Sequence, residues 1–409
     1  IQPDGKIVAA GFGWQSWERA VVMRFNSDGS IDNSFSGDGI AIIEIGGFSD
    51  RLWDIELQDD GKIVGCGTCF VSGSDSDWCS LRLNPDGTLD SSYGQGGFFT
   101  LDLGATQVSA EALKIMDDGR ILMAGYAVPD GTYLMQFAMF NSNGTLDESW
   151  DNDGLVEVII SNADDAVKSL AIQEDGKILA AGYGWNGFNY DFALTRLNPD
   201  GSLDLTFDGD GKELTSIGEA NDFIESIYLR SNGDIIAGGT SFTNENGFEF
   251  ALAMYNSDGS LKEEFGEGGK VISNLSDGAD IIFGMEAAPD GNILAAGTID
   301  PSPVGEENFE LALVKYIDQF DLSTNLSTEQ KLKIFPNPNQ GIFQLKIEGF
   351  ASVVSSLQIF DLTGRLVWQK RVPTNGEITS INLGNIPSGV YLLSSKTGEK
   401  VVKKRIVIE

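Results

Sequence analysis

Residues 175–182 read DGKILAAG. Close variants of this phrase begin at five other positions, Asp4, Asp60, Asp118, Asn232 and Asp290, so that the six copies are spaced by 56, 58, 57, 57 and 58 residues. A repeat of this period is typical of proteins made of tandem units, each of which buries its apolar surface against its neighbours. The repeat therefore decides the fold class, and every single motif has to be compared across the copies.

One unit contains four short segments in which apolar and polar residues alternate, as expected for strands. They are GGFFTLDL (96–103), ALKIM (112–116), RILMAGY (120–126) and LMQFAMFN (134–141). Asp118 and Gly119 tolerate the positive φ of a tight hairpin turn between the second and third segments. Four antiparallel strands per unit predict an all-β fold, a β-propeller with six or seven four-stranded blades, and a solenoid is the alternative.

A second recurring phrase, of the form DGSLDxxF, follows the fourth segment in five copies. The array ends after LALVKY (311–316) without this phrase, which suggests that the phrase is the crossover to the next blade. With this phasing the chain enters midway through a blade, and five complete blades follow. The missing pair of strands is then expected to lie upstream or to be supplied in another way.

The first copy of this phrase, NSDGSIDNSF (26–35), looks like part of an EF-hand calcium loop. When its glycine is aligned with the EF-hand glycine, Arg24 takes the first ligand position and Phe35 the last. The last position is aromatic in every copy, and Asp32 is replaced by Lys262 in the fifth. We therefore expect a turn in which the carboxylate caps the backbone and the aromatic residue packs onto the blade, with at most weak cation binding.

Composition excludes several classes of function. The chain has no histidine, which removes His-dependent catalysis and His-containing metal sites. Its net charge of −34 disfavours nucleic acid and anionic lipid as partners. No apolar run is long enough for a transmembrane segment, and no signal peptide is visible.

The three cysteines, Cys66, Cys69 and Cys79, lie within one short stretch and are too few for a four-thiolate zinc site. Cys66 takes a slot that holds Ala in most copies, which favours a small buried residue. A disulfide from Cys79 to Cys69 or Cys66 is the alternative if the compartment is oxidising, and a redox Cys-x-x-Cys site is a third reading.

Two further groups of residues have both a structural and a functional interpretation. Asp50, Asp165, Asp222 and Asp280 precede a strand in their copies, where they either satisfy backbone donors or line a binding face. Trp14, Trp17 and Trp185 follow the DGK strand, where they either pack or stack on a sugar or peptide. Among 61 acidic residues, no pair stands out as catalytic, and no catalytic or metal-binding residue is assigned.

The recurring DGK[IL]-A-G and R[LF]N-DGSLD-SF phrases resemble the delta-60 repeat family of bacterial secreted proteins. The resemblance covers about residues 1–316 and implies an extracytoplasmic, propeller-like array. It does not imply a defined activity.

The composition changes after Tyr316. Residues 329–409 carry 11 basic and 6 acidic residues, a net charge of +5, whereas the rest of the chain carries −39. IDQFDLSTNLSTEQ (317–330) is polar and aperiodic and is interpreted as a linker. About seven short strands follow in residues 331–409, which suggests a small Ig-like β-sandwich.

The same segment strongly resembles the type A C-terminal sorting domain of the type IX secretion system. The matching residues appear in the expected order and form the candidate sorting signal: Pro336, Asn337, Pro338, Gly341, Gly364, Gly389, Tyr391, Lys403, Lys404 and Arg405. The resemblance implies a Bacteroidota cargo whose tail is recognised by the translocon and shuttle barrel and removed by a sortase. The mature protein would be released or joined to lipopolysaccharide at the cell surface.

The sequence thus predicts a propeller over residues 1–316, a linker over 317–330 and a sorting domain over 331–409. We expect the propeller to be a binding or adhesion module for glycan or surface protein, without a cofactor and without enzymatic activity. The alternative is a secreted hydrolase that uses carboxylates, with or without calcium. A single active site would break the symmetry of the repeats at one place.

Overall fold

In the computed structural model the chain separates into two compact units, Ile1–Asp318 and Gln319–Glu409. The described residues of the first unit are 1–316 without 15, 73–74, 162, 244–246, 277, 289–291 and 301–308. Those of the second are 331–335, 341–348, 354–360, 365–373, 378–384, 386–387, 389–397 and 400–408. None of these residues forms a helix long and apolar enough to cross a membrane.

The first unit consists of six consecutive antiparallel sheets, which we call blades one to six. Blade one contains β1 (Ile7–Trp14), β2 (Glu18–Phe25) and β3 (Ile40–Ile43), and blade two contains β4 (Asp50–Leu57), β5 (Ile63–Ser72), β6 (Asp75–Leu83) and β7 (Phe98–Leu101). Blade three contains β8 (Val108–Ile115), β9 (Ile121–Ala127), β10 (Leu134–Phe140) and β11 (Leu155–Val158), and blade four contains β12 (Asp165–Ile172), β13 (Ile178–Trp185), β14 (Tyr190–Leu197) and β15 (Lys212–Thr215). Blade five contains β16 (Asp222–Leu229), β17 (Ile235–Thr243), β18 (Gly247–Tyr255) and β19 (Lys270–Ser273), and blade six contains β20 (Ile281–Ala287), β21 (Ile293–Ile299) and β22 (Glu310–Tyr316).

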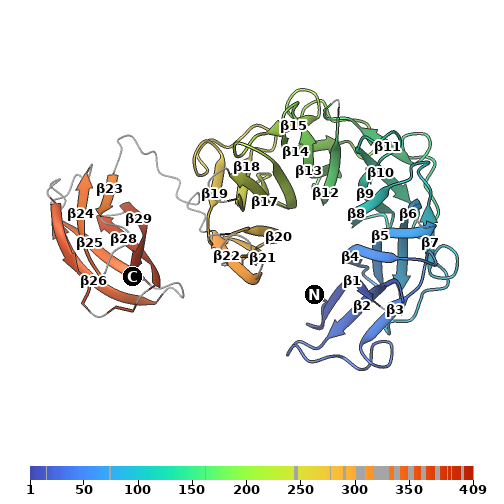
Figure 1. Ribbon diagram of the computed structural model, residues 1–409, viewed down its shortest axis with the longest axis horizontal. Coiled ribbons are helices and arrows are strands. Elements are labelled where there is room, and N and C mark those ends of the chain that lie inside the picture. The colour runs from blue at the N-terminus through green and yellow to red at the C-terminus, as the bar shows by residue number, and fades with distance from the viewer. Residues whose placement is uncertain are drawn as a thin grey trace. The chain divides into compact units, whose positions relative to one another are not determined.

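The blades follow one another along an arc (Figure 1). The first strands of the four-stranded blades, such as β4, β8 and β12, lie on its concave side, and the fourth strands, such as β7, β11 and β15, lie on its convex side. This is the packing of a β-propeller, and it confirms the predicted fold class.

The predicted strands are present, but the predicted boundary between blades is wrong. The segment GGFFTLDL gives β7, which pairs with β6 as the outer strand of the preceding blade. The DGSLDxxF phrase therefore joins the third strand to the fourth strand within one blade, and the crossover lies between the fourth strand and the next inner strand. As a result four blades have four strands, while blade one lacks an inner strand and blade six lacks an outer strand among the described residues.

The core lies between the blades rather than inside any one of them. Ile178 and Ala180 of blade four, for example, are buried against Phe137 and Met139 of blade three. Because strand side chains alternate between the two faces of a sheet, each blade needs an apolar pattern on both faces. A continuous apolar run in the second strand of each repeat, such as ILAAG at 178–182, meets this need.

The DGSLDxxF phrase and the arginine that precedes it link neighbouring blades by hydrogen bonds. In blade one, Arg24 Nε donates to Asp32 Oδ2 over 2.7 Å, and the guanidinium lies 4.8 Å from the centre of the buried Phe35 ring. The same guanidinium donates to the carbonyl of Pro85 in the next blade. Asp32 also caps Ser34 N, as the sequence predicted, so the carboxylate that resembled a calcium ligand is occupied by cations and donors of the chain itself.

Equivalent links recur in blades two and four, through Arg82, Asp90 and Tyr93 and through Arg196, Asp204 and Phe207. In blade three Met139 takes the arginine position, and the indole of Trp150 instead donates to the carbonyl of Pro199 over 3.0 Å. The aromatic position therefore contributes to the blade seam in two chemically different ways.

A lysine or arginine of the DGK phrase completes this group of charges. The Nζ atoms of Lys62 and Lys177 lie 3.1 Å and 3.0 Å from the carboxylates of Asp90 and Asp204. In blade five both charges are exchanged: Asp234 stands in the cation position and pairs with Lys262 in the carboxylate position. The lysine that broke the predicted calcium pattern is thus one half of a reversed ion pair.

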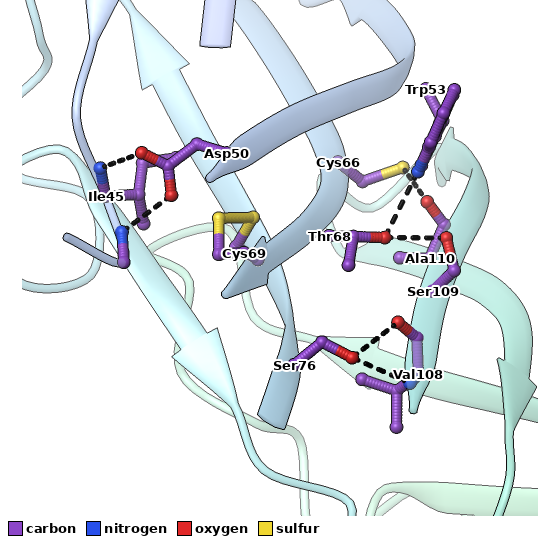
Figure 2. Close-up of a disulfide and its surroundings, with 12 residues drawn as sticks. Ile45, Asp50, Trp53, Cys66, Thr68, Cys69, Ser76, Val108, Ser109 and Ala110 are labelled. Atoms are coloured by element: carbon purple, nitrogen blue, oxygen red, sulfur yellow. Dashed lines mark hydrogen bonds between the residues drawn. A yellow bond between two sulfur atoms is a disulfide. The ribbon is translucent and has the colours of Figure 1, made fainter. Parts of the chain in front are cut away.

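A buried aspartate at the start of the inner strand accepts hydrogen bonds from backbone amides of the crossover that precedes it. Asp50 accepts hydrogen bonds from Ile45 N and Gly46 N over 2.9 Å and 2.7 Å (Figure 2). Asp165, Asp222 and Asp280 accept equivalent bonds from the residues five and four positions before them. All four are fully buried, which confirms their interpretation as residues that satisfy backbone donors.

Cys69 and Cys79 form a disulfide between β5 and β6, with their Cα atoms 5.8 Å apart (Figure 2). Cys66 is a buried free thiol that donates to Ala110 O of blade three over 3.6 Å. Burial, followed by the charges of Asp54 and Glu111, raises the pKa of this thiol well above its usual value. The structure therefore confirms that Cys66 is a small buried residue and that Cys79 pairs with Cys69, not with Cys66, in a disulfide.

The described residues of the second unit form a sandwich of two antiparallel sheets with seven strands. One sheet contains β23 (Lys331–Phe335), β24 (Ile342–Glu348) and β27 (Ile378–Asn382), and the other contains β25 (Val354–Phe360), β26 (Leu366–Pro373), β28 (Gly389–Thr397) and β29 (Lys400–Ile408). Apolar residues of both sheets form one buried cluster that includes Leu345, Leu357, Ile381, Leu393 and Ile406. This arrangement fits the predicted Ig-like fold.

Candidate functional site

Five inner strands carry a β-bulge at the same place, and the residues in the bulges break the symmetry of the repeat. The register shifts are at Leu52/Asp54, Ala110/Ala112, Val167/Ser169, Ile224/Ser226 and Ile282/Gly284. The extra residues are aromatic in blades two and six, Trp53 and Phe283, but charged in blades three to five, Glu111, Lys168 and Glu225. β-Bulges often re-aim side chains next to functional sites.

A second position breaks the symmetry in blades three and four. In the second strand, five residues after its first isoleucine, blades two, five and six have Thr68, Thr240 and Thr298. Blades three and four have Tyr126 and Tyr183 at this position, and blade one has Phe12. The bulge in the inner strand and this position in the second strand are close together, because the two strands pair in antiparallel fashion; Tyr183, for example, pairs with Ala166, two residues before Lys168.

The two tyrosines belong to an aromatic group that spans blades three to five. The Tyr183 ring centre lies 5.3 Å from Tyr190 and 5.1 Å from Phe223, and the Tyr190 and Phe223 rings are 5.6 Å apart. In blade three, Tyr126 lies 4.9 Å from Tyr133. All five side chains are half-buried. We call these residues, with Glu111, Lys168 and Glu225, the tyrosine cluster.

Asp164 ties the two halves of the aromatic group together. Its Oδ1 accepts a hydrogen bond from Tyr133 N over 3.0 Å, and its Oδ2 accepts one from the Tyr190 hydroxyl over 2.9 Å. Burial, together with the Asp164 carboxylate, raises the pKa of Tyr190 to about 12. Both tyrosines are therefore held in place by a residue at the start of blade four.

The charged residues of the tyrosine cluster form one network. Lys168 Nζ lies 2.8 Å from Glu111 Oε2, and Lys168 also interacts electrostatically with Glu225. Burial acts to lower the pKa of Lys168, but the Glu111 carboxylate, together with Glu225 and Tyr126, outweighs this effect, so the pKa is raised and the amine stays charged. Burial raises the pKa of the Glu225 carboxyl, an effect that Lys168 opposes.

The predicted aromatic residues divide into two kinds. Trp14 and Trp17 are exposed over 75% and 48% of their surface, and Trp17 contacts Phe48 at 5.8 Å, so neither is a core residue. Trp185 is half-buried and packs edge-on against Tyr190 of the tyrosine cluster, at 5.1 Å. Only Trp185 thus belongs to the asymmetric group.

The candidate sorting signal is described in part. Gly341 and Gly389 border strands of the sandwich, and the Tyr391 hydroxyl donates to Pro387 O over 2.7 Å. Lys403, Lys404 and Arg405 lie in β29, whose backbone is described. Pro336, Asn337, Pro338 and Gly364 lie outside the described residues, as does the predicted linker (317–330).

The described part of the chain contains no group of three Cys, Asp or Glu residues arranged to hold a metal ion. The sequence alone did not single out Glu111, Lys168, Glu225 or the tyrosines. A comparison of the six copies position by position would have shown that charged residues and tyrosines gather in copies three to five. It would not have shown that the two positions lie side by side, because that depends on the strand pairing.

Two family models match the chain. Residues 333–409 match the secretion system C-terminal sorting domain. Residues 2–35, 58–93, 173–207 and 230–265 match a β-propeller domain of unknown function (DUF5122). Each of these four segments runs from the turn before the second strand to the aromatic residue that ends the DGSLDxxF phrase. A comparison with curated proteins gives no match.

The propeller also resembles several solved structures at low identity. A glucose dehydrogenase is 10% identical, with a TM-score of 0.43 over 76% of this chain and all of the enzyme. A β-xylosidase/α-arabinofuranosidase from a compost microbial metagenome is 11% identical, with a TM-score of 0.35 over 66% of this chain and 91% of the enzyme. The polysaccharide lyase Uly1 is 11% identical, with a TM-score of 0.36 over 94% of this chain and 89% of that protein. At these scores the resemblances carry no argument about function.

The sorting domain marks a protein that the type IX secretion system exports to the cell surface or releases. The disulfide between Cys69 and Cys79 is of the kind that persists in such an oxidising environment. The chain is therefore a type IX secretion cargo that joins a β-propeller of the DUF5122 type to a C-terminal sorting domain.

Proposed function

We propose that the propeller is a glycan-binding module, displayed at the cell surface or released, and that the tyrosine cluster is its ligand site. The observation that supports this most strongly is the break in repeat symmetry. Charged residues occupy the bulge in blades three to five, where blades two and six have aromatic residues, and tyrosines take the threonine position of the second strand in blades three and four. Repeats that served only to build the fold would have no reason to differ at these positions together.

The chemistry of the cluster matches a sugar. Aromatic rings bury the apolar faces of pyranose rings, and a few polar groups placed among them fix the orientation of a ligand. The rings of Tyr183, Tyr190 and Phe223 provide the apolar surface, while Glu111 and Lys168, which interact electrostatically with Tyr126, provide an acceptor and a donor.

The proposal is tested with a glycan array probed with the full-length chain, followed by calorimetry on the glycans that bind. The variant Tyr183→Thr gives blade four the residue that blades two, five and six have, so the fold should be retained. We expect it to weaken binding at least 10-fold. Trp17→Ala is the matched control, because it removes an exposed aromatic residue outside the cluster.

Three outcomes would count against the proposal. Binding to a surface protein but to no glycan would replace the ligand class. Loss of binding in Trp17→Ala but not in Tyr183→Thr would move the site to blades one and two. Release of shortened oligosaccharides during the assay would favour the hydrolase alternative, with Glu111 and Glu225 as its first candidate carboxylates.

A further inference from the structure

Two exposed aromatic side chains of blades one and two, Phe12 and Trp53, take the same two repeat positions as residues of the tyrosine cluster. Phe12 stands where blades three and four have Tyr126 and Tyr183, and Trp53 is the extra residue of its β-bulge. The two ring centres lie 5.8 Å apart, and the side chains are exposed over 46% and 43% of their surface. Repeat symmetry therefore places this pair at the same end of the propeller as the cluster, with more of each ring open to a ligand.

Hydrogen bonds connect the pair with the tyrosine cluster (Figure 2). Trp53 Nε1 donates to Thr68 Oγ1 over 3.1 Å, and Thr68 Oγ1 lies 2.7 Å from Ser109 Oγ of blade three. Ser109 pairs with Tyr126 across β8 and β9, so their side chains stand on the same face. We call Phe12, Trp53, Thr68, Ser109 and Tyr126 the aromatic row. It reaches from blade one to the tyrosine cluster, which continues to blade five.

The exposed end of the aromatic row is held in place before any ligand arrives. The hydrogen bond to Thr68 fixes the indole of Trp53. The ring of Phe12 packs against the Arg51 guanidinium, whose carbon lies 5.2 Å from the ring centre, and Arg51 Nε in turn donates to Glu18 Oε2 over 2.6 Å. A surface ordered in this way loses little conformational entropy when a ligand binds to it.

We propose that Phe12 and Trp53 form a second subsite on the glycan-binding face, so that the ligand is a polysaccharide chain and not a short sugar. This inference rests on the proposed function and names the class of ligand for the same face. Packed sheets lie about 10 Å apart, so a surface that runs from blade one to blade five is longer than one or two sugar rings. A chain bound along it stacks on the pair and on the tyrosines at the same time.

A long chain can bind more tightly than a short one even without a second subsite, because one site can hold it in several registers. That gain follows the number of registers and does not depend on Phe12 or Trp53. When one ligand joins two subsites, the second contact is intramolecular and raises the affinity by a larger factor. Removing Phe12 and Trp53 therefore separates the two effects.

The experiment measures dissociation constants of matched disaccharides and hexasaccharides for the full-length chain by calorimetry. The probes are xylo-, cello- and manno-oligosaccharides, together with both lengths of any other glycan that binds on the array. Phe12→Thr gives blade one the residue of blades two, five and six, and Trp53→Ala removes the indole. Trp17→Ala is the matched control, because it removes an exposed aromatic residue that packs on Phe48 and is not in the aromatic row.

We expect the wild-type chain to bind the hexasaccharide at least about 50-fold more tightly than the disaccharide. Each single variant should lose part of this gain, and Phe12→Thr/Trp53→Ala should keep only about 5-fold, the gain that the registers of a hexasaccharide provide to one site. The affinity for the disaccharide should change less than about 3-fold in all three variants, because it binds at the tyrosines. Trp17→Ala should keep the full gain. Circular dichroism and urea unfolding check that the variants are folded.

The inference is overturned, and the proposed function survives, if a disaccharide binds and the double variant keeps the full gain of the hexasaccharide. It is also overturned if the wild-type chain gains no more than the registers provide, or if Trp17→Ala loses as much of the gain as the double variant. If no glycan binds the wild-type chain at all, the proposed function itself fails and this inference fails with it.

Discussion

The reversed ion pair of blade five permits a direct exchange of charges. Asp234 and Lys262 occupy the positions that hold a cation and an aspartate in blades one to four, and their side chains are 9% and 21% exposed. In Asp234→Lys two ammonium groups would meet at one seam. The double variant Asp234→Lys/Lys262→Asp would restore the polarity seen between Arg120 and Asp147 of blade three, which also lacks an arginine in the third strand.

The magnitude follows from this degree of burial. Two unit charges about 4 Å apart near a protein surface interact by about 4 kcal/mol before desolvation is subtracted. A pair intermediate between exposed and buried should lose about 2–3 kcal/mol of unfolding free energy when attraction becomes repulsion. If each single variant loses about 2–3 kcal/mol and the double variant only about 1 kcal/mol, the coupling energy between the two positions is at least about 3 kcal/mol.

The assay is urea unfolding of the full-length chain, followed by tryptophan fluorescence and circular dichroism. Glu264→Lys is the control, because it makes the same change of charge at an exposed position and should cost less than about 0.5 kcal/mol. If the double variant is as unstable as the sum of the two single variants, the exchanged residues do not act as a pair and the account of this seam is wrong.

Three other predictions concern stability and export. Lys6, with help from Ser34 and Arg24, lowers the pKa of Asp32 in the folded protein. The ionised Asp32 carboxylate therefore stabilises the fold above about pH 4, and this stabilisation is lost as the pH falls through the pKa of the folded state. Asp32→Asn should thus have a lower urea midpoint than wild type at pH 7, by a margin that narrows towards about pH 2. Breaking the Cys69–Cys79 link in Cys69→Ser/Cys79→Ser should cost about 3 kcal/mol, whereas Cys66→Ala should cost less than about 1 kcal/mol; equal losses would contradict the assignment of the disulfide. When residues 331–409 are deleted, cell fractionation should find the propeller in the periplasm and not at the cell surface. Normal surface delivery of the truncated chain would contradict the role of the tail.

The sequence predicted the repeat, the four strands and the hairpin turns, because these depend on local patterns. It failed at the boundary between blades, because the pairing of β7 with β6 rather than β8 is decided by contacts across a long connection. The phrase at 26–35 is not this boundary, but the residues that flank it contact the next blade: Arg24 donates to Pro85 O and Ser36 N donates to Asp86 O. The sequence thus predicted that this region lies where two blades meet, but not that the phrase connects the third and fourth strands of one blade.

The candidate site was hidden for a related reason. Trp185 is a candidate from the sequence because tryptophan is rare, but Glu111 and Tyr183 are common residue types within predicted strands. Their meaning comes from neighbours that lie a whole repeat away, such as Lys168 beside Glu111 and Phe223 beside Tyr183. A periodic pattern identifies what the copies share, whereas function here depends on how they differ and on which differences meet.

A crystal structure of the full-length chain with the best neutral oligosaccharide from the array would test the central claim most directly. The account predicts a sugar ring against Tyr183, Tyr190 or Phe223. A ligand bound elsewhere, for example on the exposed aromatic residues of blades one and two or along the outer strands, would contradict it.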